Sequence, residues 1–152
     1  MEMEMKKIYL LRHADAAPMG SGLKDSQRPL TDLGRRQASE VAAEAKQKSF
    51  FFDVILTSPY ARARETARIL AGIYEMPGKV IEEPLLASGC SVQEFRKILA
   101  RYQSCSSILC VGHEPDLGEI AVALLGRDAS WPFKKAELRE IDLLQEKKKE
   151  GL

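Results

Sequence analysis

The hydrophobic positions of the chain alternate between two kinds of spacing. Short apolar runs rich in strand-forming residues predict buried β-strands at 7–12, 51–58 and 106–112, and weaker runs predict strands at 79–86 and 136–144. Between these runs, apolar residues recur three and four positions apart, which is typical of helices that bury one face. The pattern therefore predicts strands and helices in the order β-α-β-α-β-α-β-α-β.

The ends of the predicted helices carry capping residues. Thr31 precedes the first helix, and Ser58 and Pro59 suit the N-cap and the first position of the second. The SVQE sequence at 91–94 fits a capping box for the third helix, and Gly126 ends the fourth. Strands that alternate with helices pair in parallel and are covered on both faces. The predicted fold class is therefore α/β, a three-layer α/β/α sandwich with a mostly parallel central sheet.

Composition places the chain among ordinary globular proteins. It has 152 residues, of which 45% are hydrophobic and 30% charged, enough for one domain with its own core. We therefore expect a single domain over residues 1–152, with flexible ends at about 1–6 and 145–152. The formal net charge of +1 gives no overall attraction to nucleic acid or to a membrane, so neither is expected as a partner.

The cysteines and the N-terminus bear on the cellular compartment. Cys90, Cys105 and Cys110 are odd in number and lack the paired spacing of a zinc site or a disulfide framework. The first residues have no apolar stretch of the kind that a signal peptide needs, and no run approaches the length of a membrane span. These features predict a cytoplasmic protein.

Polar motifs follow three of the predicted strands. Arg12 and His13 come directly after the first strand, the SPYAR sequence at 58–62 follows the second, and the GHEP sequence at 112–115 follows the fourth. In open α/β sheets, ligands bind outside the carboxyl ends of the parallel strands, which share one edge. The sequence therefore predicts a site at this edge that contains two arginines and both histidines of the chain, His13 and His113.

This set of side chains suits a phosphoryl group. Guanidinium groups match phosphate oxygens and stay charged, and helix N-termini offer unpaired N–H groups. One histidine can act as a nucleophile while the other donates a hydrogen bond. Each residue taken alone is better explained as a structural or solvated side chain, but their joint placement favours function. The chemistry needs no metal or cofactor, and none is expected.

Four motifs together resemble the histidine phosphatase superfamily, which includes phosphoglycerate mutases and acid phosphatases. They are LRHADA, RPLTDLG, SPYARARETA and VGHEPDL, and the resemblance covers about residues 7–125. The short chain, the RPLT sequence and VGHEP are similar to the small branch of SixA-type phosphohistidine phosphatases. The resemblance implies a phosphoglycerate mutase-like fold.

The resemblance also implies roles for individual residues. His13 corresponds to the nucleophile that becomes transiently phosphorylated. Arg12 and Arg62 correspond to the arginines that hold the phosphoryl group, and His113 to the second histidine of the pocket. Arg28, in RPLT, corresponds to a substrate-binding position. Because a nucleophilic histidine must be unprotonated on its attacking nitrogen, activity is expected to fall at acid pH.

The sequence departs from the family pattern in two places. Ala14 stands where glycine usually follows the RH pair, which is tolerable if the backbone there has ordinary angles. Leu85 and Leu86 occupy the stretch after the third strand in which larger members carry a glutamate as proton donor. The resemblance therefore leaves the general acid of this chain unidentified.

Two acidic residues near the nucleophile in sequence are candidate proton donors. Asp15 and Asp25 lie in the loop between the first strand and the first helix. They can equally form turns or pair with Arg28, and the sequence leaves both interpretations open. A phosphoramidate bond is labile, so a weak proton donor can suffice to break it.

The predicted function is a metal-independent phosphatase that forms a phosphohistidine intermediate and hydrolyses phosphohistidine on a protein. No insertion is long enough to form a lid, which favours an open site that admits a protein-borne group. Two alternatives stay open, a phosphatase for a small phosphorylated metabolite and a non-catalytic phosphate-binding module. The expected partner is accordingly a phosphorylated protein or a small phosphorylated substrate.

Overall fold

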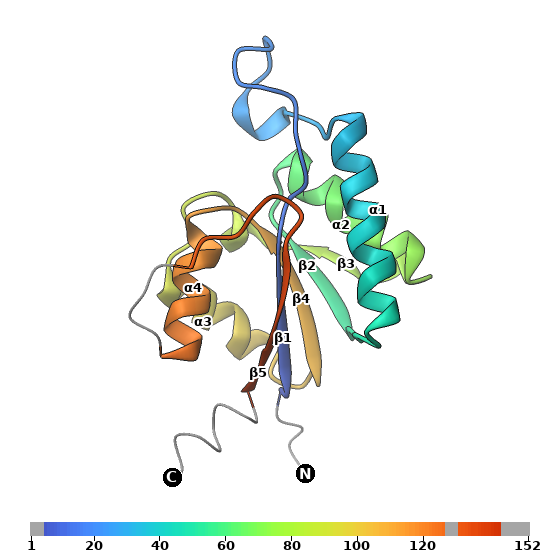
Figure 1. The fold of residues 1–152 in the computed structure, drawn as a ribbon. Helices are drawn as coiled ribbons and strands as arrows, with labels where there is room; N and C mark the ends of the chain where they lie inside the picture. The colour runs from blue at the N-terminus through green and yellow to red at the C-terminus, as the bar shows by residue number, and fades with distance from the viewer. Residues whose placement is uncertain (1–4, 127–130, 144–152) are drawn as a thin grey trace.

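The structure, a computed structural model, describes residues 5–126 and 131–143. Its centre is a five-stranded sheet with the order β3-β2-β4-β1-β5 (Figure 1). The strands are β1 (Lys7–Arg12), β2 (Val54–Thr57), β3 (Val80–Glu82), β4 (Ser107–Gly112) and β5 (Leu138–Asp142). β5 runs antiparallel to β1 at one edge, and the other pairings are parallel. The mostly parallel sheet is as predicted.

Helices cover both faces of this sheet. α1 (Asp32–Gln47) and α2 (Ala61–Ile73) lie on one face, and α3 (Val92–Arg101) and α4 (Asp116–Leu125) lie on the other (Figure 1). Each helix connects two strands in chain order, so the strand–helix alternation read from the sequence is confirmed. The three-layer α/β/α architecture is confirmed with it.

The core is divided in two by the central strands. Leu10 and Leu56 pack with α3 and α4, whereas their strand neighbours Leu11 and Ile55 pack with α1 and α2. Successive side chains of a strand point to opposite faces. Because both faces are covered, apolar residues are needed at every position, and this is why the strands read as continuous apolar runs.

The third predicted strand is shorter in the structure than the apolar run at 79–86. β3 ends at Glu82, and a 3₁₀ turn covers Pro84–Leu86. Proline has no N–H to donate to a strand ladder, which explains why pairing stops before it. The shortening places Leu86 in the core.

Most of the predicted helix caps are confirmed. The Thr31 hydroxyl accepts a hydrogen bond from the Gly34 N–H, Ser91 forms the capping box, and Gly126 has the left-handed backbone of a helix end. The predicted N-cap at Ser58 is wrong, because α2 begins later, at Ala61. The Ser58 hydroxyl instead accepts from the Tyr60 N–H, at 3.1 Å, and closes a tight turn before the helix.

The described chain begins with Met5, whose side chain packs in the core beside α3 and α4. The N–H of Lys6 donates to the carbonyl of Ser106 at 2.7 Å, so the segment before β1 is joined to the sheet. The predicted flexible end at 145–152 lies outside the described residues. Within those residues, no helix is both long and apolar enough to cross a membrane.

Candidate active site

The site forms at the carboxyl ends of three adjacent strands. β4 lies between β1 and β2, with Gly112 opposite Arg12 and Val111 opposite Thr57. The residues that follow these positions are therefore brought together. The ring centroids of His13 and His113 are 5.3 Å apart.

Hydrogen bonds on both ring nitrogens define the tautomer of the buried His13. The Nε–H of Arg62 lies 3.3 Å from Nε2 of His13 and can only donate to it, because a guanidinium has no acceptor. On the other side of the ring, Nδ1 lies 2.8 Å from the carbonyl oxygen of Ala14, which can only accept. The proton is therefore on Nδ1, and the lone pair of the unprotonated Nε2 accepts the hydrogen bond from Arg62.

The surroundings of His13 also keep the imidazole neutral. Burial lowers the pKa of His13 to about 4, and the nearby positive charges of Arg62 and Arg12 add to this effect against the opposing hydrogen bond to Ala14. At neutral pH the ring is thus neutral and held in one orientation, which is the state that a nucleophilic histidine requires.

The backbone next to the nucleophile has ordinary geometry. Among the described non-glycine residues, positive φ values occur at Ser49, Glu75 and Ala136, and not at Ala14. The condition under which alanine is expected to be tolerated after the RH pair is therefore met. The Ala14 N–H donates to the Thr66 hydroxyl of α2 at 3.1 Å, which joins this segment to the helix that carries Arg62.

His113 forms the other wall of the site and is only 2% exposed. Its Nε2 lies 2.8 Å from the Ser58 hydroxyl, and the Tyr60 ring packs edge-on against it with centroids 4.9 Å apart. Burial lowers the pKa of His113 to about 3, and the charges of His13 and Arg62 add to this effect. Ser58, predicted as a helix cap, contacts His113 instead, and its position after a strand end is the sequence signal that indicates a site residue.

Arg12 is held by a segment that sequence reasoning did not assign to the site. Its Nη1 donates to the carbonyl of Phe133 at 3.1 Å, and its backbone N–H donates to that of Glu137 at 3.2 Å. The N–H of Ala136 lies within hydrogen-bond distance of the carbonyls of both Arg12 and His13. The segment 133–137 thus supports the RH pair from the β5 side.

Arg62 is buried at the first turn of α2 and contacts the loop that follows β1. Its Nη1 donates to the carbonyl of Asp25 at 2.8 Å, and its Nη2 lies 3.3 Å from the Asp25 carboxylate. The same carboxylate pairs with Arg28 at 2.9 Å. Asp25 therefore bridges two arginines and brings Arg28 beside the site, and the substrate-binding role of Arg28 stays a prediction.

The two candidate proton donors are both engaged by cations. Burial works to raise the pKa of Asp25, but hydrogen bonds and charges from Arg28 and Arg62 outweigh it and lower the pKa. The pKa of Asp15 is lowered by hydrogen bonds from Lys135, at 2.9 Å, and from the Thr31 hydroxyl, at 2.7 Å. Both carboxyls are ionised at neutral pH, which matches the turn and ion-pair interpretation and gives the proton-donor interpretation no geometric support.

The loop between β1 and α1 is closed at its base. The N–H of Ala17 donates to the carbonyl of Pro29 at 2.8 Å, and Arg28 Nη1 donates to the carbonyl of Ala17 at 2.6 Å. A Cβ at Gly34 would lie 2.0 Å from the Asp15 carbonyl oxygen, so only glycine lets α1 approach the loop this closely. The loop stands above the carboxyl edge of the sheet (Figure 1).

The acids near the third and fourth strands make other contacts. The buried Glu83 pairs with Arg101 at 2.5 Å and accepts from the Tyr102 hydroxyl at 3.3 Å. Asp116 accepts the N–H groups of Gly89 and Cys90 and so ties that loop to α4. In residues 5–126 and 131–143, no group of three or more histidine, cysteine or acidic side chains could hold a metal ion.

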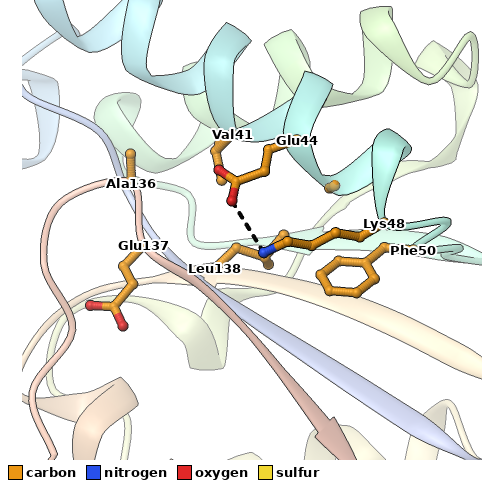
Figure 2. A pocket seen from close by; sticks show the side chains of 8 residues that line it. Val41, Glu44, Lys48, Phe50, Ala136, Glu137 and Leu138 are labelled. Carbon is orange, nitrogen blue, oxygen red and sulfur yellow. Dashed lines mark ion pairs between the residues drawn. The ribbon is translucent and has the colours of Figure 1, made fainter.

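A cavity of about 180 Å³ lies away from the two histidines, between the end of α1 and the start of β5. Figure 2 shows the Glu44–Lys48 ion pair, at 3.1 Å, beside Phe50 and Leu138. None of the predicted site residues lines this cavity.

Comparisons with known proteins agree with the geometry. The family model described as "Histidine phosphatase superfamily (branch 1)" matches residues 8–87. An uncharacterized protein of Picosynechococcus sp. (strain PCC 7002) is 38% identical over 120 residues, covering 78% of this chain and 72% of that protein. A phosphohistidine phosphatase SixA homolog of Haemophilus influenzae is 31% identical over 144 residues, covering 88% of this chain and 86% of that protein.

The likeness extends to solved structures. The structure of the protein histidine phosphatase SixA complexed with tungstate is similar with a TM-score of 0.81 and 23% sequence identity, covering 91% of this chain and 90% of that chain. This likeness confirms the predicted fold.

Proposed function

Because the chain belongs to the histidine phosphatase superfamily (branch 1), we propose that it is a phosphatase that hydrolyses phosphohistidine on a protein through a phosphorylated His13. One observation carries the proposal: the neutral His13 presents an unprotonated Nε2 to the guanidinium of Arg62, 3.3 Å away. A nucleophilic nitrogen beside a fixed cation suits attack on an anionic phosphoryl group.

In the first half of the reaction, the Nε2 lone pair of His13 exchanges its hydrogen bond from Arg62 for a bond to phosphorus while the P–N bond of the substrate breaks. The substrate imidazole carries a proton on its other ring nitrogen and leaves as a neutral group. His13 keeps its own Nδ1 proton, held by the carbonyl of Ala14. Arg12, Arg62 and His113 bind the equatorial phosphoryl oxygens, where negative charge is spread in the transition state.

In the second half, water attacks the phosphorus of phosphorylated His13. The P–N bond breaks, its electron pair returns to Nε2, and both hydrogens of the water leave with the phosphate as dihydrogen phosphate. His13 is again neutral with its proton on Nδ1, so neither half requires a net proton transfer from the protein.

This proton balance favours phosphohistidine over phosphate esters. An ester releases an alkoxide, which needs a proton from a general acid as it leaves. Asp15 and Asp25 are ionised and held by Lys135, Arg28 and Arg62, so they are poorly suited to supply one. An imidazole leaving group does not need one.

A protein rather than a small metabolite is proposed as the carrier of the phosphoryl group. The loop beside the site carries two apolar side chains on its outer part, Met19 at 72% and Leu23 at 48% exposed. Exposed apolar side chains beside a site are typical of a surface that contacts another macromolecule.

The test compares turnover of a histidine-phosphorylated protein, free phosphohistidine and a panel of small phosphate esters. We expect hydrolysis of both phosphohistidine substrates at a kcat/KM at least about 100-fold above the esters, and loss of this activity in His13→Ala. The control is Arg68→Ala, an exposed arginine of α2. Preference for an ester would support the metabolite phosphatase instead. Phosphate binding without turnover of any substrate would support the binding module.

A further inference from the structure

Ser58 is a fully buried serine at the point where β2 ends, and its hydroxyl faces the second histidine of the site. Two contacts surround this hydroxyl. The Tyr60 N–H donates to the oxygen at 3.1 Å, and Nε2 of His113 lies 2.8 Å away. The contact with Tyr60 uses a lone pair of the oxygen and leaves the hydroxyl proton free to donate.

The hydroxyl proton has one acceptor within hydrogen-bond distance in the described part of the chain, which is Nε2 of His113. If Nε2 carried the ring proton instead, a buried hydroxyl would be left without an acceptor, which is unfavourable. The satisfied arrangement is therefore the one in which Ser58 donates and Nε2 accepts.

A neutral imidazole has a single N–H, so accepting at Nε2 puts the proton on Nδ1. In residues 5–126 and 131–143, Nδ1 of His113 is buried without a hydrogen-bond partner. We propose that Ser58 is a positioning residue that holds the His113 proton on Nδ1, where it serves as a donor to a phosphoryl oxygen. The position of the proton is independent of the proposed function, whereas its effect on turnover rests on it.

Residues 58–62 therefore contact both histidines, and these contacts suit one ring to act as a nucleophile and the other to act as a donor. Arg62 donates to Nε2 of His13, so this nitrogen is unprotonated and carries the lone pair of the proposed nucleophile. Ser58 donates to Nε2 of His113 and leaves an N–H as donor. The opposite tautomer of His113 would direct a lone pair at the charged oxygens and repel them.

The first experiment measures the proton directly, by NMR of the protein with ¹⁵N-labelled histidine. The chain has two histidines, so the spectrum contains four ring nitrogens, and His13→Ala assigns them. We expect Nδ1 of His113 to be protonated and Nε2 to be bare in the native protein, and Ser58→Ala to move the ring toward a mixture of tautomers. A native His113 with its proton on Nε2 would overturn the proposal independently of any activity assay.

The second experiment measures turnover of phosphoramidate. Removing a fixed donor to a transition-state oxygen costs up to about 10²–10³ in kcat, and a ring that still samples the active tautomer should lose about tenfold, with KM little changed. Ser107→Ala is the matched control, because Ser107 is another buried serine, whose hydroxyl donates to the carbonyl of Phe51 at the other end of the sheet. Its kcat should stay within about twofold of native.

A double-mutant cycle separates positioning from general support of the fold. If Ser58 acts through the imidazole, Ser58→Ala should change kcat by less than about twofold in a His113→Ala background. An equal tenfold loss in both backgrounds would contradict the proposal. If the native enzyme hydrolyses neither phosphoramidate nor phosphohistidine, the proposed function fails, while the NMR result still decides the position of the proton.

Discussion

The Nε–H of Arg62 donates to Nε2 of His13, and the Nδ1–H of the same ring donates to the carbonyl of Ala14. Both hydrogen bonds require the same tautomer, so the nitrogen that can attack is Nε2.

Incubation with phosphoramidate should therefore label His13 on Nε2. The labelled protein, quenched at alkaline pH, can be examined by ³¹P–¹⁵N NMR. Phosphate on Nδ1 would contradict the assignment, and His13→Ala should remain unlabelled.

In the proposed mechanism, Arg62 contacts both His13 and the phosphoryl group, so the loss of its side chain should be severe. We expect Arg62→Ala to lower kcat/KM for phosphohistidine about 10²–10³-fold. Arg62→Lys should restore little, because an ammonium group lacks the planar fork that contacts His13 and a phosphoryl oxygen together. Arg68→Ala, on the exposed side of the same helix, should be close to native in the same assay. Full activity in Arg62→Lys would mean that charge alone is needed.

The low pKa of His13 predicts an unusual pH profile. A histidine with an ordinary pKa would lose its nucleophilic form below about pH 6.5. Burial lowers the pKa of His13 to about 4, so the loss of kcat/KM caused by protonation of His13 should have its midpoint near 4. A midpoint near 6.5 would show that the ring is not desolvated in the free enzyme.

The stability of the fold must be followed over the same pH range. Both histidines have lowered pKa values in the folded state, so the unfolded chain binds more protons between pH 6.5 and about 4. The contribution of the two neutral histidines to the free energy of unfolding is therefore complete above about pH 6.5, and it decreases as the pH falls through this window. Circular dichroism at each pH separates loss of activity from unfolding.

The fold and the gathering of the predicted site residues at one edge of the sheet were readable from the sequence because their signals are local. A strand reads as a continuous apolar run, and a polar motif directly after a parallel strand must lie at the carboxyl edge. That rule alone brings His13 and His113 to neighbouring strands, and the structure places their rings 5.3 Å apart.

Contacts that depend on distant pairing were not readable. Lys135 lies 120 positions from its partner Asp15, and no local sequence pattern near either residue indicates that they pair. Ala136 adopts a left-handed backbone without glycine, so the turn that supports Arg12 has no sequence signature. Ser58 carries a hydroxyl that suits a helix cap as well as a histidine partner, and the local sequence does not distinguish the two.

The interpretation of Asp15 and Asp25 as ion-pair residues is tested by removing their charge. Because an imidazole leaving group needs no general acid, Asp15→Asn and Asp25→Asn should each retain kcat for phosphohistidine to within about tenfold. Asp25→Asn should also bind vanadate more tightly, since a carboxylate that repels the anion and occupies Arg62 is gone. A loss beyond about 100-fold in either variant would identify that residue as a required proton donor.

Substitution of the exposed apolar residues in the loop beside the site tests whether the substrate is a protein or a small molecule. Met19 and Leu23 are exposed in the free protein, and a bound protein would bury them at a gain of about 1–2 kcal/mol each. The double variant Met19→Ser/Leu23→Ser should therefore lower kcat/KM for a histidine-phosphorylated protein about tenfold or more. Turnover of phosphoramidate, which is too small to reach the outer loop, should stay within about twofold.

Phe51→Ser is the control, because Phe51 is 63% exposed before β2, at the opposite edge of the sheet. An equal loss on both substrates would mean that the loop acts by holding Asp25 against Arg62, and no loss on either would show that a protein substrate does not use this surface.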